Sequence, residues 1–370
     1  MGRLPYCAED RGTTGILEER VETSWLWVVP GMWRITKFAG RIWDKAFTAA
    51  ALKYFQSRMM RLIDRPIDHC KGEDGSIIDI SGNIDHLSFD IMGALTFGED
   101  FGMIKGTDKG SLEVRSFYDQ RFEARYQRGA EVRGDIFQYL LQPDPKTGTQ
   151  LKKPQIAEEA VAVVVAGSDI SSICMIFIFY YLLMNQETYK TLQVEVDTLW
   201  DGTSELDGQQ LVLIGAPYLN GVINESLRLA ELDPNGNQRS TLKGGPMING
   251  KYIPGSTQLS IHKWTIQRDE RNVTRALEFI PERWIHEERE KIGLNNHNTK
   301  GYLPFGAGIY SCVGKPLALL EIRLFIVRFM RKLELEPALD YDLGRYPFEV
   351  ASGLTLMKKP LPVMVKNRAV

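Results

Sequence analysis

A long apolar stretch in the middle of the chain limits what this sequence can fold into. Between residues 160 and 184 only Asp169 carries a charge, and the stretch is long enough to cross a bilayer as a helix. Polar residues lie at its centre, at 167–169 and 171–172, where lipid would make an aspartate costly. The stretch therefore favours a buried central helix of a soluble domain over a membrane span.

Helical periodicity dominates the rest of the chain. Apolar residues recur at three- and four-residue spacing, which predicts amphipathic helices. Strand signals are few: residues 247–253 predict a hairpin on Asn249-Gly250, and short strands are expected at 258–261, 353–357 and 361–365. We therefore expect a mainly α fold with a small β portion. The predicted helices are 42–64, 86–96, 154–184, 187–200, 216–230 and 316–333.

Composition indicates a sizeable intracellular protein. The chain has 370 residues, a net charge of −2 and 44% hydrophobic residues, so it can bury a large core. The near-neutral charge gives no reason to propose nucleic acid as a partner. Four cysteines lie far apart without C-x-x-C spacing, which argues against a zinc site and against a disulfide-rich secreted domain. The N-terminus lacks a secretory pattern, and the apolar run 25–33 is too short to span a bilayer, so no N-terminal anchor is expected.

A glycine-rich loop near the end of the chain carries the strongest chemical signal. Phe305, Gly308, Cys312 and Gly314 form the pattern Phe-x-x-Gly-x-x-x-Cys-x-Gly, directly before a predicted apolar helix. A cysteine thiolate that binds haem iron needs glycines that let the backbone pass close to the porphyrin, and amide donors near the sulfur. The start of the helix adds unpaired amide groups that favour a negative sulfur. The loop therefore predicts haem ligation by Cys312, and the alternative is a buried cysteine in a glycine-rich turn.

Two further motifs predict a buried ion cluster. Glu225 and Arg228 are three residues apart on a predicted helix, which puts the carboxylate and the guanidinium on one face. Alone, this spacing is typical of a surface ion pair. The turn at 279–284 can deliver Arg283 to Glu225, since buried charges need such pairing. The alternative is an ordinary turn with a solvated arginine.

The centre of the apolar stretch carries a third motif. Gly167 can open the groove of the helix, and Asp169 stands beside it. This arrangement suits the binding of dioxygen and the movement of protons. A packing glycine beside a hydrogen-bonded acid would show the same pattern, so both interpretations stand.

In this order and spacing, the four sites resemble the cytochrome P450 family. The resemblance covers residues 41–365, so we expect a divergent segment at 1–40 followed by a P450-like haem domain at 41–370. Within the family, the chain is similar to fungal haem-thiolate monooxygenases of secondary metabolism. That closer likeness rests on residues 41–47, 87–98, 238–239 and 310–316.

The resemblance implies a haem b (iron protoporphyrin) enzyme. It would oxidise a small apolar metabolite with dioxygen and with electrons from a flavoprotein reductase. The implied location is intracellular, either cytoplasmic or peripherally associated with the endoplasmic reticulum, and membrane contact would not need an N-terminal anchor. Substrate contacts would come from 165–171, 232–237 and 352–355. The implied site residues are the iron ligand Cys312 with Phe305, Gly308 and Gly314 in its loop, Arg239 on a haem propionate, and the structural cluster Glu225, Arg228 and Arg283.

The chain departs from the family's pattern in ways that bear on turnover. The family usually has threonine after the acid of its central helix, whereas Ile170 cannot donate a proton. Asp169 and Ser171 are then the candidates for proton delivery, although Ser171 lies about a hundred degrees around the helix from Ile170. We also expect the fold to be truncated at the N-terminus and internally, between 103 and 135, where helices would roof the substrate pocket. Two alternatives therefore stand beside the monooxygenase: a degenerate haem-binding remnant without turnover, and a haem-thiolate enzyme that uses peroxide or rearranges its substrate.

Overall fold

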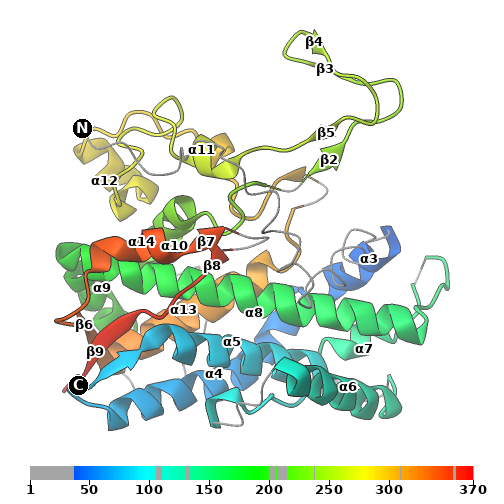
Figure 1. Ribbon diagram of the computed structural model, residues 1–370, viewed down its shortest axis with the longest axis horizontal. Coiled ribbons are helices and arrows are strands. Elements are labelled where there is room, and N and C mark those ends of the chain that lie inside the picture. Colours follow the sequence, from blue (N-terminus) through cyan, green and yellow to red (C-terminus); the bar gives the residue numbers. More distant parts are fainter. Residues whose placement is uncertain are drawn as a thin grey trace, which may run out of the picture.

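Helices make up most of the computed structural model, which describes residues 37–105, 111–130, 134–144, 146–200, 206, 215–236, 238–308, 311–352 and 356–369 (Figure 1). The predicted mainly α fold with a small β portion is confirmed. Most of the expected N-terminal segment, residues 1–36, lies outside the described residues. The α-helices are α3 (Lys37–Ala46), α4 (Ala49–Gly72), α5 (Ile80–Phe97), α6 (Ser111–Gln127), α7 (Phe137–Leu140), α8 (Lys153–Met184), α9 (Gln186–Leu199), α10 (Pro217–Ala230), α11 (Lys263–Gln267), α12 (His286–Lys291), α13 (Lys315–Lys332) and α14 (Tyr346–Glu349).

The long apolar stretch forms α8 and lies at the centre of the fold (Figure 1). Helices α5, α10 and α13 pack against it. Most side chains from Ser171 to Leu183 are buried. By length and hydropathy α8 could cross a membrane, and no other helix of the described residues passes that test. More than half of its most apolar window is buried against protein, which agrees with the prediction of a central core helix.

The single helix predicted over 42–64 is wrong in both its start and its extent. The structure breaks it into α3 and α4, with Thr48 between them in extended geometry. The Thr48 hydroxyl accepts a hydrogen bond from the amide of Ala51 at 3.4 Å, so it caps the first turn of α4. Helix α4 then continues through Pro66 to Gly72, because the buried face of α4 on both sides of the proline packs against the core.

The strands form small antiparallel sheets at the edges of the helical body. The expected strand at 361–365 is the middle strand of a three-stranded sheet with the order β1-β9-β6. That sheet joins residues far apart in the sequence, since Ile77 pairs with Met364 and Leu335 pairs with Val365. The strands are β1 (Ile77–Asp79), β2 (Arg239–Ser240), β3 (Met247–Ile248), β4 (Lys251–Tyr252), β5 (Gln258–Leu259), β6 (Leu333–Pro337), β7 (Ala351–Ser352), β8 (Leu356–Met357) and β9 (Pro362–Asn367).

The predicted Asn-Gly hairpin is present and stands away from the helical body (Figure 1). Met247 pairs with Tyr252 and Ile248 pairs with Lys251. The turn between them needs two residues with positive φ, which are Asn249 at 48° and Gly250 at 76°. Strands β2 and β5 pair at the base of the same hairpin. The short 3-10 helices are η1 (Met103–Lys105), η3 (Pro281–Trp284), η4 (Thr299–Gly301) and η6 (Leu343–Arg345).

Candidate functional site

The loop that carries Cys312 is closed by its own backbone. The amide of Cys312 donates to the carbonyl of Phe305 at 2.8 Å, and the amide of Ser311 donates to that of Gly308 at 3.0 Å. Gly308 has a φ of +73°, which an L side chain rarely adopts, and no atom lies within 4 Å of where its Cβ would stand. Residues 309 and 310 lie outside the described residues. The fold thus presents Cys312 two residues before Gly314, the N-terminal cap of α13.

Cys312 is an exposed residue, whereas Cys70 and Cys174 are buried, although protein atoms still surround much of the Cys312 sulfur. Protein atoms around the thiol have the largest effect on its pKa and raise it by desolvation. The backbone amides of Gly314 and Lys315 lower the pKa by hydrogen bonding to the sulfur, and the balance still leaves it above the ordinary value. The expected amide donors are therefore in place, but they do not by themselves make the sulfur negative. A bound metal ion would supply the charge that displaces the thiol proton.

Apolar surface in the first half of α8 is left uncovered by the described residues. Ala166 is exposed although it lies within the most apolar stretch of the chain, and most residues of 161–170 are only partly buried. Apolar surface left uncovered in this way usually marks a binding site. A cysteine on an exposed loop with backbone amides at its sulfur is a donor set that haem iron takes from proteins, so the residues present fit this group.

The predicted ion cluster is formed, and it is fully buried. Arg228 makes a two-pronged contact with Glu225, in which Nε and Nη2 each lie 2.8 Å from a carboxylate oxygen. Arg283 Nε donates to the same carboxylate at 3.1 Å, and so do the indole of Trp284 and the amide of Ile280, each at 3.0 Å. Glu225, Arg228 and Arg283 are at most 1% exposed. The structure therefore joins helix α10 to the 3-10 helix η3 through one carboxylate.

Backbone carbonyls satisfy the remaining donors of the two arginines. Arg228 donates to the carbonyls of Gln267, Ala276 and Glu278, and Arg283 donates to those of Thr274 and Arg275. Burial opposes ionisation of Glu225, but the hydrogen bond and charge of Arg228, together with the charge of Arg283, outweigh it and hold the pKa of Glu225 below its ordinary value. The cluster thus stays ionised inside the protein.

Asp169 lies in a small charged cluster that the sequence did not indicate. Lys358, just after strand β8, places its Nζ 4.0 Å from Asp169, 2.6 Å from Asp85 of α5 and 2.7 Å from the hydroxyl of Ser172. Desolvation raises the pKa of Asp169, the charge of Lys358 lowers it, and that of Asp85 raises it, so that the pKa remains above the ordinary value. Asp169 and Asp85 therefore share one lysine.

Gly167 and Ile170 are both used in packing. A Cβ on Gly167 would lie 2.6 Å from the sulfur of Met92, so the glycine lets α5 approach α8 closely. Ile170 is partly buried and packs against the core. Gly167 thus serves packing, whereas the part of Asp169 in proton movement stays a prediction.

Ser171 faces a buried carboxyl group. It hydrogen-bonds to Glu321 of α13, which also accepts a hydrogen bond from Ser88 of α5 at 3.1 Å. This contact ties the helix that follows Cys312 to both α5 and α8. Desolvation raises the pKa of Glu321 to about 8, and the two serines lower it only in part. Sequence reasoning missed Glu321, although a lone acid on the apolar face of 316–333 was the available signal.

The carboxyl of Glu321 makes stability depend on pH. Its pKa lies near 8 in the fold and near 4.5 in the unfolded chain, so the stabilisation is complete below about pH 4.5 and is lost as the pH rises towards 8. In that window each pH unit removes up to about 1.4 kcal/mol of unfolding free energy. We expect the Glu321→Gln variant to lose less free energy of unfolding between pH 6.5 and 8 than the parent chain. Urea unfolding followed by circular dichroism would measure the difference. Glu231, whose pKa is also raised to about 8 by burial, remains in the variant, so part of the slope should persist. An unchanged slope would contradict the assignment.

Arg239 lies on strand β2 and is exposed. Its Nη1 donates to the carbonyl of Gln238 at 2.9 Å. Its contact with a haem propionate stays a prediction.

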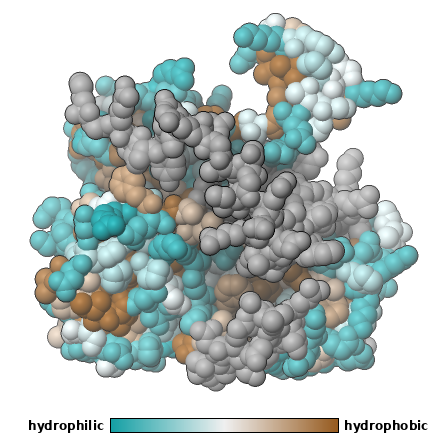
Figure 2. Space-filling model, in the orientation of Figure 1, coloured by the Kyte–Doolittle hydropathy of each residue, from teal (hydrophilic) through white to brown (hydrophobic). Residues whose placement is uncertain are grey.

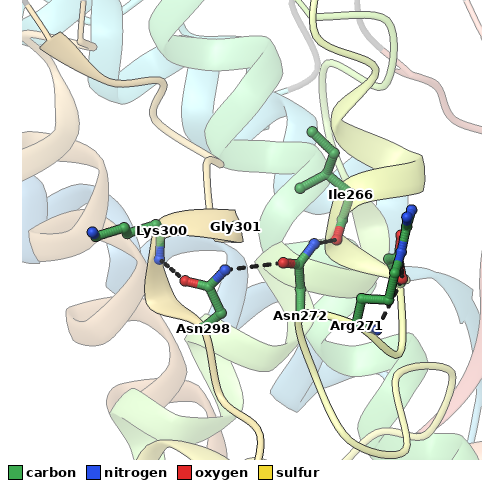
Figure 3. Close-up of a pocket in the computed structure, with 7 residues that line it drawn as sticks. Ile266, Arg271, Asn272, Asn298, Lys300 and Gly301 are labelled. Atoms are coloured by element: carbon green, nitrogen blue, oxygen red, sulfur yellow. Dashed lines mark hydrogen bonds and ion pairs between the residues drawn. The ribbon is translucent and has the colours of Figure 1, made fainter. Parts of the chain in front are cut away.

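A shallow pocket lies elsewhere, beside α11 and η4 (Figure 3). The amides of Asn298 and Asn272 hydrogen-bond to each other at 2.9 Å, and Asn272 also donates to the carbonyl of Ile266 at 3.1 Å. Asp269 and Arg271, which also line the pocket, pair with each other, and none of the predicted site residues lines it.

A mainly α fold with an exposed cysteine on a glycine loop at the start of a helix is typical of cysteine-ligated haem proteins. The family model Cytochrome P450 matches residues 111–365, more than half of the chain. The chain belongs to the cytochrome P450 family.

Curated relatives and solved structures agree with this assignment. Cytochrome P450 monooxygenase nodW of Hypoxylon pulicicidum is 29% identical over 330 residues, which cover 80% of this chain and 60% of that protein. Cytochrome P450 monooxygenase FCK2 of Fusarium pseudograminearum is 28% identical over 369 residues, which cover 89% of this chain and 65% of that protein. The chain thus spans less than two thirds of the length of either relative.

Among solved structures, the heme domain of cytochrome P450DA superposes with a TM-score of 0.77 at 22% identity, covering 90% of this chain and 76% of that one. The cytochrome P450 CYP102L1 gives 0.78 at 24% identity, covering 90% and 78%. At these identities the likeness shows the fold.

Proposed function

We propose that the chain acts as a haem-thiolate monooxygenase that oxidises a small apolar metabolite. The observation that carries the proposal is the exposed residue Cys312, held by a closed glycine loop at the start of α13 with two backbone amides at its sulfur. Haem b bound through this cysteine would supply the activation of dioxygen, with electrons from a flavoprotein reductase. The names of the fungal relatives support this activity.

The chain's own residues would hold the cofactor from the side of the cysteine loop. Cys312 would bind iron, and Phe305, Gly308 and Gly314 would shape its surroundings. The ammonium of Lys315 lies 5.5 Å from the ring centre of Phe305, which supports the position of that ring beside the start of α13. Arg239 would pair with a propionate, since its planar fork suits a carboxylate.

The apolar face of α8 would hold the substrate. Residues 165–170 are mostly only partly buried, which leaves apolar surface for a small metabolite. Further contacts are proposed for 232–236 and Ser352, while the remaining parts of those two segments lie outside the described residues. We place the protein inside the cell, in the cytoplasm or peripherally on the endoplasmic reticulum.

Asp169 would deliver protons. The charges of Lys358 and Asp85 would shift its pKa in opposite directions. The lysine lies between the two carboxylates, so a proton gained or lost by Asp169 changes the balance of one small cluster. Ser171 has its hydroxyl engaged with Glu321, so any part that it plays would run through that carboxyl.

Ile170 favours a second candidate function, in which the chain binds haem but does not complete the monooxygenase reaction. Its side chain has no hydroxyl and packs against the core. Such a protein would be a haem-binding remnant, or an enzyme that uses peroxide or rearranges its substrate.

A spectrum of the haem-loaded full chain separates these functions. A red-shifted Soret band of the ferrous carbon monoxide form is expected for every thiolate-ligated candidate, and its absence would exclude all except a remnant that binds haem in another way. With the band present, reductase-dependent oxidation would support the monooxygenase. If no reductase-dependent oxidation is seen across a panel of apolar compounds that shift the haem spectrum, the second candidate is favoured.

Replacing Ile170 by threonine tests the proton path. A hydroxyl beside Asp169 is expected to raise product formed per NADPH consumed by up to about 100-fold, the lower part of the range for a positioned proton donor. Ile170→Val keeps the branched side chain without the hydroxyl and is the matched control. Product and released peroxide would be measured together. Equal coupling in the threonine and valine variants would reject the missing hydroxyl as the limiting feature.

A further inference from the structure

A buried acid at the end of α10 has no part in the site described so far. Figure 2 shows hydrophilic residues over much of the coloured surface, where charged side chains normally lie. Glu231, the C-terminal cap of α10, is instead 1% exposed, and its φ of 38° puts it in the left-handed region. Its Oε1 atom is enclosed and has no hydrogen-bond partner among the residues that the structure describes. A strained backbone and an unpaired buried oxygen at one residue are costly, and such a combination usually marks a functional group.

The side chain of Gln267 connects Glu231 to the cysteine loop. Gln267 ends α11 and is 1% exposed. Its Nε2 atom donates to the carboxyl of Glu231 and to the carbonyl of Arg228, the latter at 3.3 Å, and its Oε1 atom accepts from the amide of Leu303 at 2.9 Å. The amide of Leu303 can only donate, so the neighbours fix the orientation of the Gln267 side chain. The guanidinium of Arg228 also binds the backbone carbonyl of Gln267 at 2.8 Å, which holds this residue against the buried ion cluster.

The contact with Leu303 continues to Cys312 through one short turn. The carbonyl of Leu303 accepts a hydrogen bond from the amide of Gly306 at 3.0 Å. The carbonyl of Phe305 accepts one from the amide of Cys312 at 2.8 Å. The position of the Gln267 side chain therefore bears on the position of the cysteine.

Glu231 and Cys312 also share an electrostatic neighbour. The ammonium of Lys263, a residue that is 6% exposed and lies 3.0 Å from Asp233, lowers the pKa of the Glu231 carboxyl and that of the Cys312 thiol. Burial has the largest effect on Glu231 and raises its pKa to about 8. The charged and titratable groups around Glu231 come from the end of α10, from α11 and from the residues that follow α11 and η4: Arg228, Asp233, Lys263, Arg268 and Tyr302. Burial holds the pKa of Tyr302 well above its ordinary value, so this tyrosine does not titrate in the same range.

We propose that Glu231 and Gln267 are positioning residues that link the reduction potential of the bound haem iron to the protonation of Glu231. The inference rests on haem ligation by Cys312, and the two residues act through the cysteine loop and not on the substrate. When ferric iron takes up one electron from the reductase, one positive charge is lost near the loop, so the Glu231 carboxylate binds a proton from solvent more readily. Neutral Glu231 thus favours ferrous iron, and ionised Glu231 favours ferric iron. The reduction potential therefore falls as the pH rises through the pKa of Glu231.

Redox titration of the haem-loaded full chain between pH 6.5 and 9.5 tests this link. A unit charge about 10 Å away changes the proton affinity of a buried group by roughly 10-fold, which corresponds to a fall in the potential of up to about 59 mV. Glu231→Gln mimics the neutral acid, so this variant should keep the low-pH potential of the parent chain across the whole range. Glu321→Gln is the matched control, because it removes another buried acid whose pKa is raised to about 8, and it should keep the pH dependence of the parent chain.

Gln267→Met tests the connection to the cysteine loop. Methionine has a similar length but no amide, so the amide of Leu303 loses its acceptor. We expect part of the ferrous carbon monoxide form to lose its red-shifted Soret band, haem to be released about 10-fold faster, and the potential to depend less on pH. The matched control is Gln56→Met, since Gln56 is also buried and donates to the carbonyl of Leu206 at 2.9 Å. It should lower stability without changing the spectrum, the release of haem or the potential.

Several outcomes would overturn the inference. A parent chain whose potential does not change between pH 6.5 and 9.5 would do so even if a variant failed to fold. A pH dependence that persists in Glu231→Gln, or that disappears in Glu321→Gln, would do the same. Absence of the red-shifted band in the parent chain would reject haem ligation by Cys312 and the inference with it. The band together with an unchanged pH dependence in Glu231→Gln would reject the inference alone.

Discussion

Cys312→Ser is expected to abolish the red-shifted Soret band of the ferrous carbon monoxide form. A serine hydroxyl is a poor iron ligand at neutral pH and cannot supply the electron density of a thiolate. Loss of an outer-shell partner alone typically costs about 10–100-fold in metal affinity or activity, so loss of the ligand should reduce turnover by more than that. Spectra and haem retention on gel filtration would measure both effects.

The buried Cys70 provides the control for this experiment. It lies in α4, where burial raises the pKa of its thiol to about 12, and it is enclosed by the core. Cys70→Ala removes a sulfur atom at some cost in packing and should leave the haem spectrum unchanged. A thiolate band that survives in the folded Cys312→Ser protein would show that another residue binds the iron.

Glu225→Gln is expected to give the largest loss of stability of any single change considered. Without the carboxylate, Arg228 and Arg283 would remain buried with two positive charges and no counter-charge. Breaking a buried ion pair from one side typically costs about 3–5 kcal/mol, a large share of the roughly 5–15 kcal/mol that holds a domain together. Urea unfolding followed by circular dichroism would measure the loss.

An exposed pair with the same spacing serves as the control. Glu288 and Lys291 are also three residues apart, with side chains 42% and 65% exposed. Glu288→Gln should change the free energy of unfolding by no more than about 1 kcal/mol, as expected for a surface pair. Similar losses in the two variants would show that the buried cluster contributes little to stability.

Local patterns in the sequence predicted the parts of the fold that depend on neighbouring residues. The Asn249-Gly250 dipeptide predicted the hairpin, because the turn needs positive φ at both positions and these residue types adopt it. The hydropathy of α8 predicted a buried helix, and its polar centre argued against lipid. The break at Thr48 was missed, since periodicity continues across it and only the cap marks the boundary.

Contacts between distant segments were predicted only where a buried charged side chain would need a partner of opposite charge. Burial of Glu225 demanded a second cation, and Arg283 lay on a turn that could reach it. Periodicity shows which face of a helix is buried but not which residue of another element meets it. The contact of Lys358 with Asp169 and that of Glu321 with Ser171 therefore had to come from the structure.

The three-stranded sheet imposes an order on the assembly of this chain. Its middle strand, β9, follows its neighbour β1 by more than 280 residues. Strands β1 and β6 pair with β9 and not with each other, so both keep unpaired backbone edges until residues 362–367 have been synthesised. A ribosome-bound chain that has not reached those residues would thus hold its helices beside an open sheet and would depend on chaperones to avoid wrong pairing.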